Sequence, residues 1–170
     1  LVYCLLKNKR TLISPSCHIL FWFSMKHYGN TIKVFEDAGF SVNPFPLIWF
    51  KNDNVGILPD PARGPRQVYE TALLMSLGDR KIIRAVSNVC SYAANKAKAK
   101  HISEKPFVVM QMFLSMLVDS STRFLDPTCG SGTSLAAAER HEAESIFGMD
   151  LDLLHVETAR AALNHQRQRL

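Results

Sequence analysis

Hydrophobic and polar positions along the first 51 residues predict a buried strand, a helix and a second strand. The run 18–24, His-Ile-Leu-Phe-Trp-Phe-Ser, is short, aromatic and apolar, which is typical of a strand inside a core. Residues 26–38 then place apolar side chains at helical spacing, and Gly39 follows where a helix C-cap favours glycine. Residues 46–51, Pro-Leu-Ile-Trp-Phe-Lys, form the next apolar run, which predicts the second strand.

The rest of the chain continues this alternation. Glycines and prolines break the pattern over 52–66, which predicts a loop, and residues 79–104 have no clean period. The predicted strands are 69–77, 122–126 and 145–150, and the predicted helices are 106–118, 132–141 and a closing helix with Leu153, Val156, Ala159 and Leu163 on one face. Strands that alternate with helices indicate an α/β domain built on a mostly parallel sheet.

Composition narrows the class of protein. A chain of 170 residues with 47% hydrophobic content can bury the core of one domain, and a charged fraction of 21% excludes a disordered tail. The formal charge of +5 permits contact with a polyanion such as nucleic acid. The longest apolar stretch, 107–118, is too short to span a bilayer.

Cysteine and histidine spacing bears on metal binding and on the cellular compartment. The cysteines, Cys4, Cys17, Cys90 and Cys129, are far apart, and neither they nor the histidines show metal-ligand spacing. A disulfide framework is not expected in a chain of this size. We therefore predict no metal site and a reduced, cytoplasmic protein.

The segment 124–133, Phe-Leu-Asp-Pro-Thr-Cys-Gly-Ser-Gly-Thr, carries the candidate chemistry. A predicted strand ends in Asp126, and a tight turn with Gly130 and Gly132 then opens a helix. The helix N-terminus offers unpaired N–H groups and the positive end of the helix dipole, which suit a carboxylate or a phosphate. The next predicted strand ends in Asp150, where acidic side chains bind ribose hydroxyls in nucleotide-binding α/β folds.

Elimination favours one nucleoside ligand for this segment. A phosphate-binding P-loop requires a Gly-Lys pair, which the chain lacks, and the dinucleotide pattern G-x-G-x-x-G fails because Leu135 occupies its third glycine position. A carboxylate in front of the glycines repels a pyrophosphate and attracts the sulfonium and ammonium groups of S-adenosylmethionine. The alternative is that Gly130 and Gly132 only make a tight strand-to-helix turn; the flanking Asp-Pro, Thr133 and the acidic strand end favour the cofactor.

These residues resemble the motifs of the DNA adenine-N6 and cytosine-N4 methyltransferases. The run 126–133, Asp-Pro-Thr-Cys-Gly-Ser-Gly-Thr, is similar to that family's D-P-F-x-G-S-G-T cofactor motif, and 148–150, Gly-Met-Asp, to its Gly-Ile-Glu. Residues 101–106, His-Ile-Ser-Glu-Lys-Pro, resemble its H-P-x-x-K-P element, and 47–51, Leu-Ile-Trp-Phe-Lys, resemble its I-I-W-x-K strand. The order of these motifs, with the cofactor half last, is that of the circularly permuted subgroup.

The resemblance implies a Rossmann-like methyltransferase fold that binds S-adenosylmethionine. It divides the predicted single domain into strands and loops of the target and catalytic half at 18–78, an irregular basic linker at 79–104 and a cofactor-binding half at 105–170. Segments 43–49 and 58–65 are similar to phage- and prophage-encoded members. The implied cofactor-binding residues are Asp126, Pro127, Thr128, Gly130, Ser131, Gly132, Thr133, Asp150 and Lys105.

The sequence also departs from the family. Thr128 replaces the usual Phe and Asp150 the usual Glu, and both keep the local chemistry. The catalytic tetrapeptide Asp/Asn/Ser-Pro-Pro-Tyr/Phe, expected before residue 18, does not occur, and Asn-Pro-Phe-Pro at 43–46 begins a predicted strand, whereas the catalytic loop follows one. The catalytic residues are therefore unknown, and we expect a chain that is incomplete at its N-terminus and lacks N-terminal strands of the sheet.

DNA is the partner that the resemblance implies. In the family the tetrapeptide orients the exocyclic amine of a base flipped from the duplex. Candidate contacts to DNA phosphates are Arg63, Arg66, Lys96 and Lys98, although a solvated loop explains the lysines equally well. A homodimer, or the missing N-terminal segment, would complete the sheet. Two rival functions are methylation of RNA on the same scaffold and a non-catalytic remnant that binds cofactor or DNA.

Overall fold

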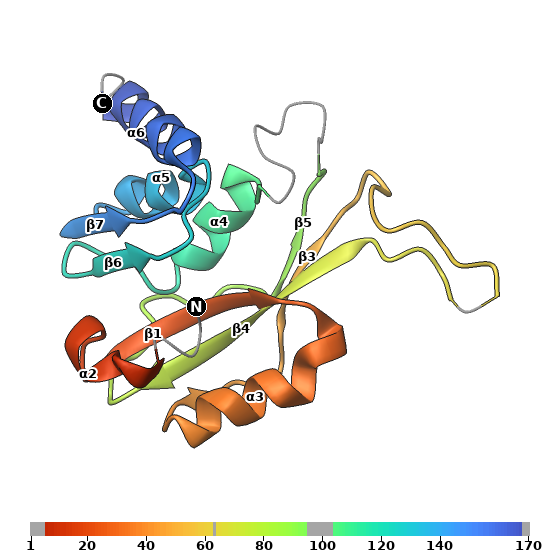
Figure 1. Cartoon of the computed structure of the whole chain (residues 1–170), viewed down its shortest axis with the longest axis horizontal. Coiled ribbons are helices and arrows are strands. Elements are labelled where there is room, and N and C mark those ends of the chain that lie inside the picture. The colour runs from red at the N-terminus through yellow and green to blue at the C-terminus, as the bar shows by residue number, and fades with distance from the viewer. Residues whose placement is uncertain (1–5, 63, 95–103, 168–170) are drawn as a thin grey trace. The chain divides into compact units, whose positions relative to one another are not determined.

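The computed structural model describes residues 6–62, 64–94 and 104–167, and these fall into two compact units, each with its own apolar core (Figure 1). The first unit is the described part of Leu1–Phe50, Gly56–Lys81 and Ser87–Ser91. The second unit is the described part of Lys51–Val55, Ile82–Val86 and Tyr92–Leu170. The predicted division at 18–78, 79–104 and 105–170 remains a prediction.

The first unit is a mixed sheet with one main helix. Its elements are α2 (Lys9–Leu12), β1 (Cys17–Phe23), the 3-10 turn η1 (Met25–His27), α3 (Tyr28–Asp37), β2 (Ser41–Val42), β3 (Leu47–Phe50), β4 (Tyr69–Leu77) and β5 (Val89–Ser91). The strand order is β1-β4-β3-β5, with β2 also paired to β4. Strand β4 is antiparallel to β1, β2 and β3, whereas β3 and β5 are parallel.

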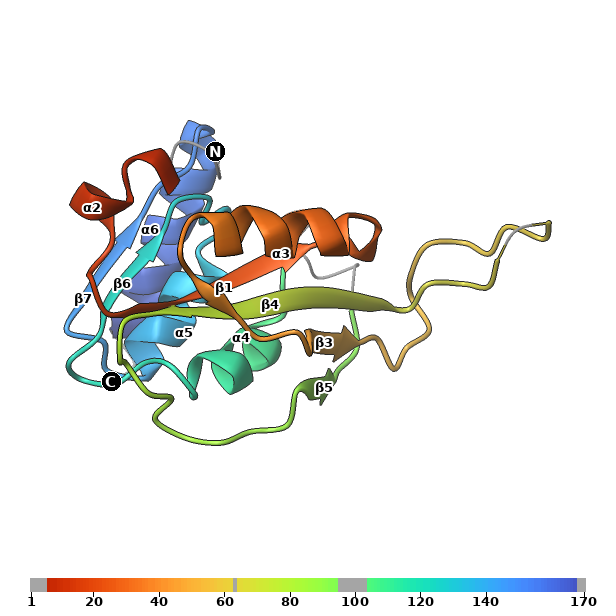
Figure 2. The ribbon, with the colours of Figure 1, turned by 90° about the horizontal axis from the view of Figure 1, so that it is seen from below.

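Aromatic and aliphatic side chains from α3 and one face of the sheet form the core of this unit. The register pairs Phe21 of β1 with Leu73 of β4, which is fully buried. The ring of Phe35 on α3 packs 5.3 Å from the Phe21 ring and 5.9 Å, edge to face, from the Phe40 ring. Figure 2 shows α3 lying along β1 and β4, so the apolar positions predicted at helical spacing do face the strands.

The second unit carries the glycine segment on a two-stranded parallel ladder. Its elements are α4 (Phe107–Leu114), β6 (Arg123–Asp126), α5 (Thr133–Arg140), β7 (Ser145–Gly148) and α6 (Leu153–Arg167). Phe124 and Ile146, paired across β6 and β7, pack against buried Leu135 and Ala159 of α5 and α6. Helix α4 packs against α5 with Phe113 fully buried. Parallel strands joined through α5 bring both strand ends to one edge, where the glycine turn lies.

The sequence predicted most of these elements, but it predicted neither α2 nor β2, and the helix predicted at 106–118 ends at Leu114. The α/β class is confirmed, and strand β4 has the predicted bounds 69–77. The predicted helix 26–38 is divided into η1 and α3, because His27 precedes α3 in a non-helical conformation. The predicted irregular segment 79–104 contains β5, a three-residue strand that carries no periodic signal and forms by pairing with β3. No helix in the described ranges is long and apolar enough to cross a bilayer.

Candidate functional site

Asp126 at the end of β6 folds the turn that follows it. Its Oδ1 accepts the N–H of Thr128 at 2.9 Å, and its Oδ2 accepts the hydroxyl of Ser134 in the first turn of α5. The carboxylate thus joins the end of the strand to the start of the helix. Asp126 was predicted to attract the positive groups of a cofactor; in the structure it organises the loop, and its contact with Ser134 was not foreseen.

The two glycines of the turn have left-handed backbones but different surroundings. Gly130 has φ +51°, and a Cβ built there meets no atom within 4 Å, so the backbone faces open space. Gly132 has φ +83°, and a Cβ there would lie 2.7 Å from the Cβ of Ala159 on α6. Gly132 is also the N-cap of α5 and provides no side-chain cap for the N–H groups of its first turn. Gly130 therefore leaves room for a ligand, whereas Gly132 allows α5 and α6 to pack closely.

The end of β7 closes on the same turn. The N–H of Met149 donates to the carbonyl of Asp126 at 2.9 Å, and the N–H of Cys129 donates to the carbonyl of Met149 at 2.8 Å. The Oδ2 of Asp150 accepts the N–H of Gly130 at 2.9 Å. The two acidic residues predicted at the strand ends are therefore brought together around the glycine turn.

Hydrogen bonds hold Asp150 in its ionised form. Its Oδ1 accepts the N–H of Asp152 at 3.0 Å and the ring nitrogen of His155 at 3.2 Å. The N–H of Asp152 is the main cause that lowers the pKa of Asp150 below its ordinary value of 3.8, and Gly130 and His155 add to it, while partial desolvation opposes them. The carboxylate is an anion at neutral pH and can accept hydroxyl groups.

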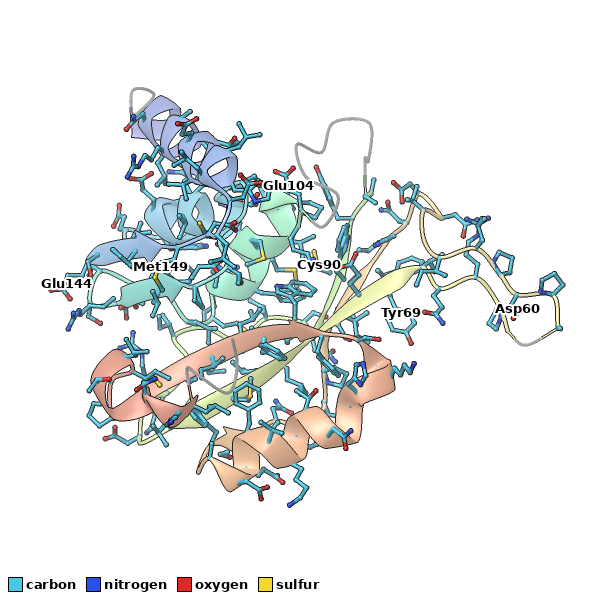
Figure 3. The ribbon with its side chains drawn as sticks, viewed as in Figure 1. Asp60, Tyr69, Cys90, Glu104, Glu144 and Met149 are labelled. Atoms are coloured by element: carbon cyan, nitrogen blue, oxygen red, sulfur yellow. The ribbon has the colours of Figure 1, made fainter. Side chains whose placement is uncertain are left out.

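A third carboxylate reaches the turn from the segment before α4. The hydroxyl of Thr133 donates to Glu104 Oε1 at 3.2 Å and lies 3.3 Å from the hydroxyl of Ser131, which is buried. Figure 3 shows Glu104 at the beginning of α4 and Met149 beyond the end of β7. Lys105, the residue that the resemblance implied, is its neighbour and is partly buried. Sequence reasoning missed Glu104, although its position inside the 101–106 element was a signal.

The thiol of Cys129 lies beneath this site. Burial raises its pKa, and the negative charges of Asp126 and Asp150 raise it further. A neutral thiol packed among Leu135 and Ala159 is a structural group, because nucleophilic cysteines require a lowered pKa. Within the described ranges, no cluster of three or more His, Cys, Asp or Glu side chains is placed to hold a metal ion.

Of the four residues predicted to contact DNA, only Arg66 lies within the described part of the chain. Arg66 is half-buried in the hairpin between β3 and β4, which is drawn together by bridges between Ile57 and Gln67 and between Asp60 and Gly64. Figure 3 shows Asp60 far out along this hairpin and Tyr69 at its base. Arg63, Lys96 and Lys98 lie outside the described residues.

The Asn-Pro-Phe-Pro segment lies between two strands. It precedes β3 and also follows the short strand β2, so its position in the chain does not by itself exclude a loop that follows a strand. The side-chain oxygen of Asn43 accepts the N–H of Phe45 at 3.0 Å, and the carbonyl of Pro44 accepts the hydroxyl of Tyr28. Phe45 is 73% exposed. The Asn43 side chain thus closes its own turn.

Solved structures of methyltransferases share this fold. No family model matches the chain, and no curated protein matches it. The structure of M1.HpyAVI in complex with SAM is 22% identical, with a TM-score of 0.79 over 96% of this chain and 81% of that chain. A second structure of M1.HpyAVI has a TM-score of 0.77 at 20% sequence identity, and the match covers 96% of this chain and 80% of that one. The structure of the cytosine-N4-specific PvuII DNA methyltransferase has a TM-score of 0.66 at 16% sequence identity, and the match covers 95% of this chain and 70% of that one. At these identities the likeness establishes the fold.

Proposed function

We propose that this chain binds S-adenosylmethionine and is the cofactor-binding part of an enzyme that methylates an exocyclic amine of DNA, adenine N6 or cytosine N4. The observation that carries the proposal is the glycine turn, in which Gly130 faces open space between the ends of β6 and β7 and its N–H binds Asp150. The shared fold with M1.HpyAVI, whose structure holds SAM, supports it.

The residues of the turn fit the cofactor. Asp150 is an anion with hydrogen-bonding capacity for ribose hydroxyls, because a carboxylate has about four acceptor sites. The uncapped first turn of α5 offers N–H groups and a positive dipole end to the carboxylate of the methionine moiety. Glu104, held by Thr133, offers a negative charge for the ammonium group.

When bound, S-adenosylmethionine supplies an electrophilic methyl group on its sulfonium. The described residues are proposed to bind and orient S-adenosylmethionine. Asp126 fixes the turn through Thr128 and Ser134, and Asp150 is the proposed acceptor of the ribose hydroxyls. Pro127, Thr128 and Ser131, which lie in the same turn, are proposed to contact the cofactor beside the glycines. Lys105, next to Glu104, is proposed to support this site. We assign no residue of the chain to the amine that accepts the methyl group.

DNA is the proposed acceptor because of the shared fold with the cytosine-N4-specific PvuII enzyme and the formal charge of +5. Arg63, Arg66, Lys96 and Lys98 are the proposed phosphate contacts. We also propose that a second copy of the chain can pair with it through an open strand edge. RNA as the acceptor, and binding without catalysis, are the rival outcomes of the tests.

Calorimetry with S-adenosylmethionine tests the cofactor site. We expect measurable binding by the parent chain and a loss of at least about tenfold in Asp150→Asn, which removes a charged acceptor while keeping its shape. Glu157→Gln, an exposed acidic residue of α6, is the matched control and should bind as the parent does. Equal heats for Asp150→Asn and the parent would overturn the assignment of this site.

Fluorescence anisotropy with labelled duplex DNA and duplex RNA of one sequence tests the acceptor class. We expect tighter binding to DNA, falling as salt rises because cations on the protein replace counterions on the phosphates. Arg66→Gln should weaken binding and reduce the slope of affinity against salt. Preference for RNA would favour the rival acceptor.

A further inference from the structure

His155 in the first turn of α6 faces the end of β7. Its Nδ1 lies 3.2 Å from Asp150 Oδ1, and its Nε2 lies 4.0 Å from Asp152 Oδ2. Both groups of the main contact are sheltered, since 24% of the His155 side chain and 16% of the Asp150 side chain is exposed. A hydrogen bond with an ionised carboxylate in such a place is stronger than one on an open surface.

The two oxygens of Asp150 differ in their partners. Oδ1 accepts two groups, the N–H of Asp152 at 3.0 Å and His155 at 3.2 Å, and its two lone pairs are therefore both engaged. Oδ2 accepts the N–H of Gly130 at 2.9 Å. One lone pair of Oδ2 then remains for a ligand beside the open backbone of Gly130.

We infer that His155 is a positioning residue: by engaging Oδ1 it fixes the plane of the Asp150 carboxylate, so that Oδ2 presents its remaining lone pair to one ribose hydroxyl of the cofactor. This inference rests on the proposed function. The Asp152 and Gly130 N–H groups both come from connecting segments, whereas His155 stands on a helix, which gives the carboxylate a rigid support. The role assigned to His155 is therefore exerted through Asp150.

Two substitutions of His155 distinguish the effect of its hydrogen bond to Asp150 from the effect of its packing. His155→Leu removes the donor, and His155→Asn keeps an N–H donor at about the position of Nδ1. We expect His155→Leu to bind S-adenosylhomocysteine about tenfold more weakly than the parent, and His155→Asn to stay within about threefold of it. Glu157→Gln on the same helix is the control and should bind as the parent does.

A second measurement needs no ligand. The ring bond of His155 contributes to the lowered pKa of Asp150, so NMR titration of this carboxyl should give a higher pKa in His155→Leu than in the parent. His155→Asn should restore most of the lowering. A purely structural role would change stability without moving the pKa of Asp150.

The outcomes distinguish this inference from the proposed function. If the parent binds S-adenosylhomocysteine and His155→Leu binds as tightly or more tightly, the positioning role is wrong and the cofactor site stands. If His155→Asn is as weak as His155→Leu, the ring acts by packing, which also overturns the inference. An unchanged pKa of Asp150 in His155→Leu does so as well. If the parent itself binds no ligand, the proposed function fails, and the role of His155 toward the ribose fails with it.

Discussion

Gly130 and Gly132 lie two residues apart in one turn, yet a methyl group would have different effects at the two positions. Alanine at either residue must adopt a left-handed backbone, at a cost of about 1–2 kcal/mol. At Gly132 the new Cβ would also overlap Ala159, which adds about 1–3 kcal/mol. We expect urea unfolding to show a loss of about 1–2 kcal/mol in Gly130→Ala and about 2–5 kcal/mol in Gly132→Ala.

The same pair tests the open space at Gly130. Its Cβ meets no protein atom, so a methyl group there would occupy room that the proposed cofactor needs. Gly130→Ala should therefore lose affinity for S-adenosylmethionine in calorimetry while keeping most of its stability. Full affinity in a folded Gly130→Ala protein would mean that the ligand does not approach this backbone.

His18 on β1 predicts how the stability of the protein depends on pH. Burial lowers the pKa of His18 from its ordinary value of 6.5, and the positive charge of Arg80 lowers it further, while a hydrogen bond with the Arg80 backbone opposes the change. The unfolded chain then binds the proton more readily than the folded chain. The contribution of His18 to the free energy of unfolding is therefore fully present above pH 6.5 and is lost as the pH falls below that value. The unfolding free energy of His18→Phe, followed from pH 7.5 to 5, should fall less than that of the parent. If the unfolding free energies of the two proteins fell by the same amount over this pH range, the prediction would be wrong.

Between elements, the packing of α5 on β7 depends on the absence of a side chain at Gly148. A Cβ there would lie 2.4 Å from Leu135 Cδ1 and 3.1 Å from the Cys129 sulfur. Gly148→Ala should cost about 1–3 kcal/mol by overpacking, and Leu135→Ala about 2–5 kcal/mol by leaving a cavity. In the double variant the new methyl group enters that cavity. We expect chemical denaturation to give a coupling of about 1–3 kcal/mol, whereas additive costs would contradict the contact.

Elements with strong local patterns could be predicted, and those formed by tertiary pairing could not. Strand β4 contains the continuous apolar run Ala72–Met75 and is followed by Gly78, so its position could be read from the sequence. Strand β5, Val89–Ser91, is exposed at both ends with only Cys90 buried, and its register is set by β3. A segment this short has no period that could distinguish it from a loop.

The candidate site was predictable in its backbone and not in its side-chain directions. The acidic strand ends and the glycine turn could be placed from their spacing, and the structure brings Asp126, Gly130 and Asp150 together. That Asp126 turns inward to Ser134 depends on side-chain rotamers, which sequence spacing does not specify. The approach of Glu104 to Thr133 joins segments far apart in the sequence, and it follows from how α4 packs on α5.

At the scale of the whole molecule, we expect the chain to bind the cofactor without transferring its methyl group. The proposed binding residues Gly130 and Asp150 meet at the glycine turn, whereas the Asp/Asn/Ser-Pro-Pro-Tyr/Phe tetrapeptide does not occur in the sequence. We expect the chain alone to bind S-adenosylmethionine and to transfer no tritiated methyl group to mixed-sequence DNA. Robust incorporation would show that another segment performs catalysis, and Asn43→Ala would then be the first variant to test.

The strand edges of the second unit predict self-association. Among the described residues β6 pairs with β7 and with no further strand, and a two-stranded ladder is marginal in water by itself. Strand edges that lack a partner offer N–H and C=O groups to another chain. One face of the ladder is covered, because Phe124 and Ile146 pack under α5 and α6, but Phe147 on the opposite face is 62% exposed. Both features favour pairing between copies of the chain.

Light scattering across a range of concentrations is the direct measurement. We expect a mass that rises with concentration, and we expect Phe147→Glu to reduce it, because a charge beside the ladder opposes edge-to-edge pairing. Val34→Glu places the same charge at an exposed apolar position of α3 and should leave the association unchanged, since this helix belongs to the first unit. A monomer at every concentration would mean that the edges of β6 and β7 are protected within one chain. An equal effect of both substitutions would mean that net charge, and not the ladder, controls the association.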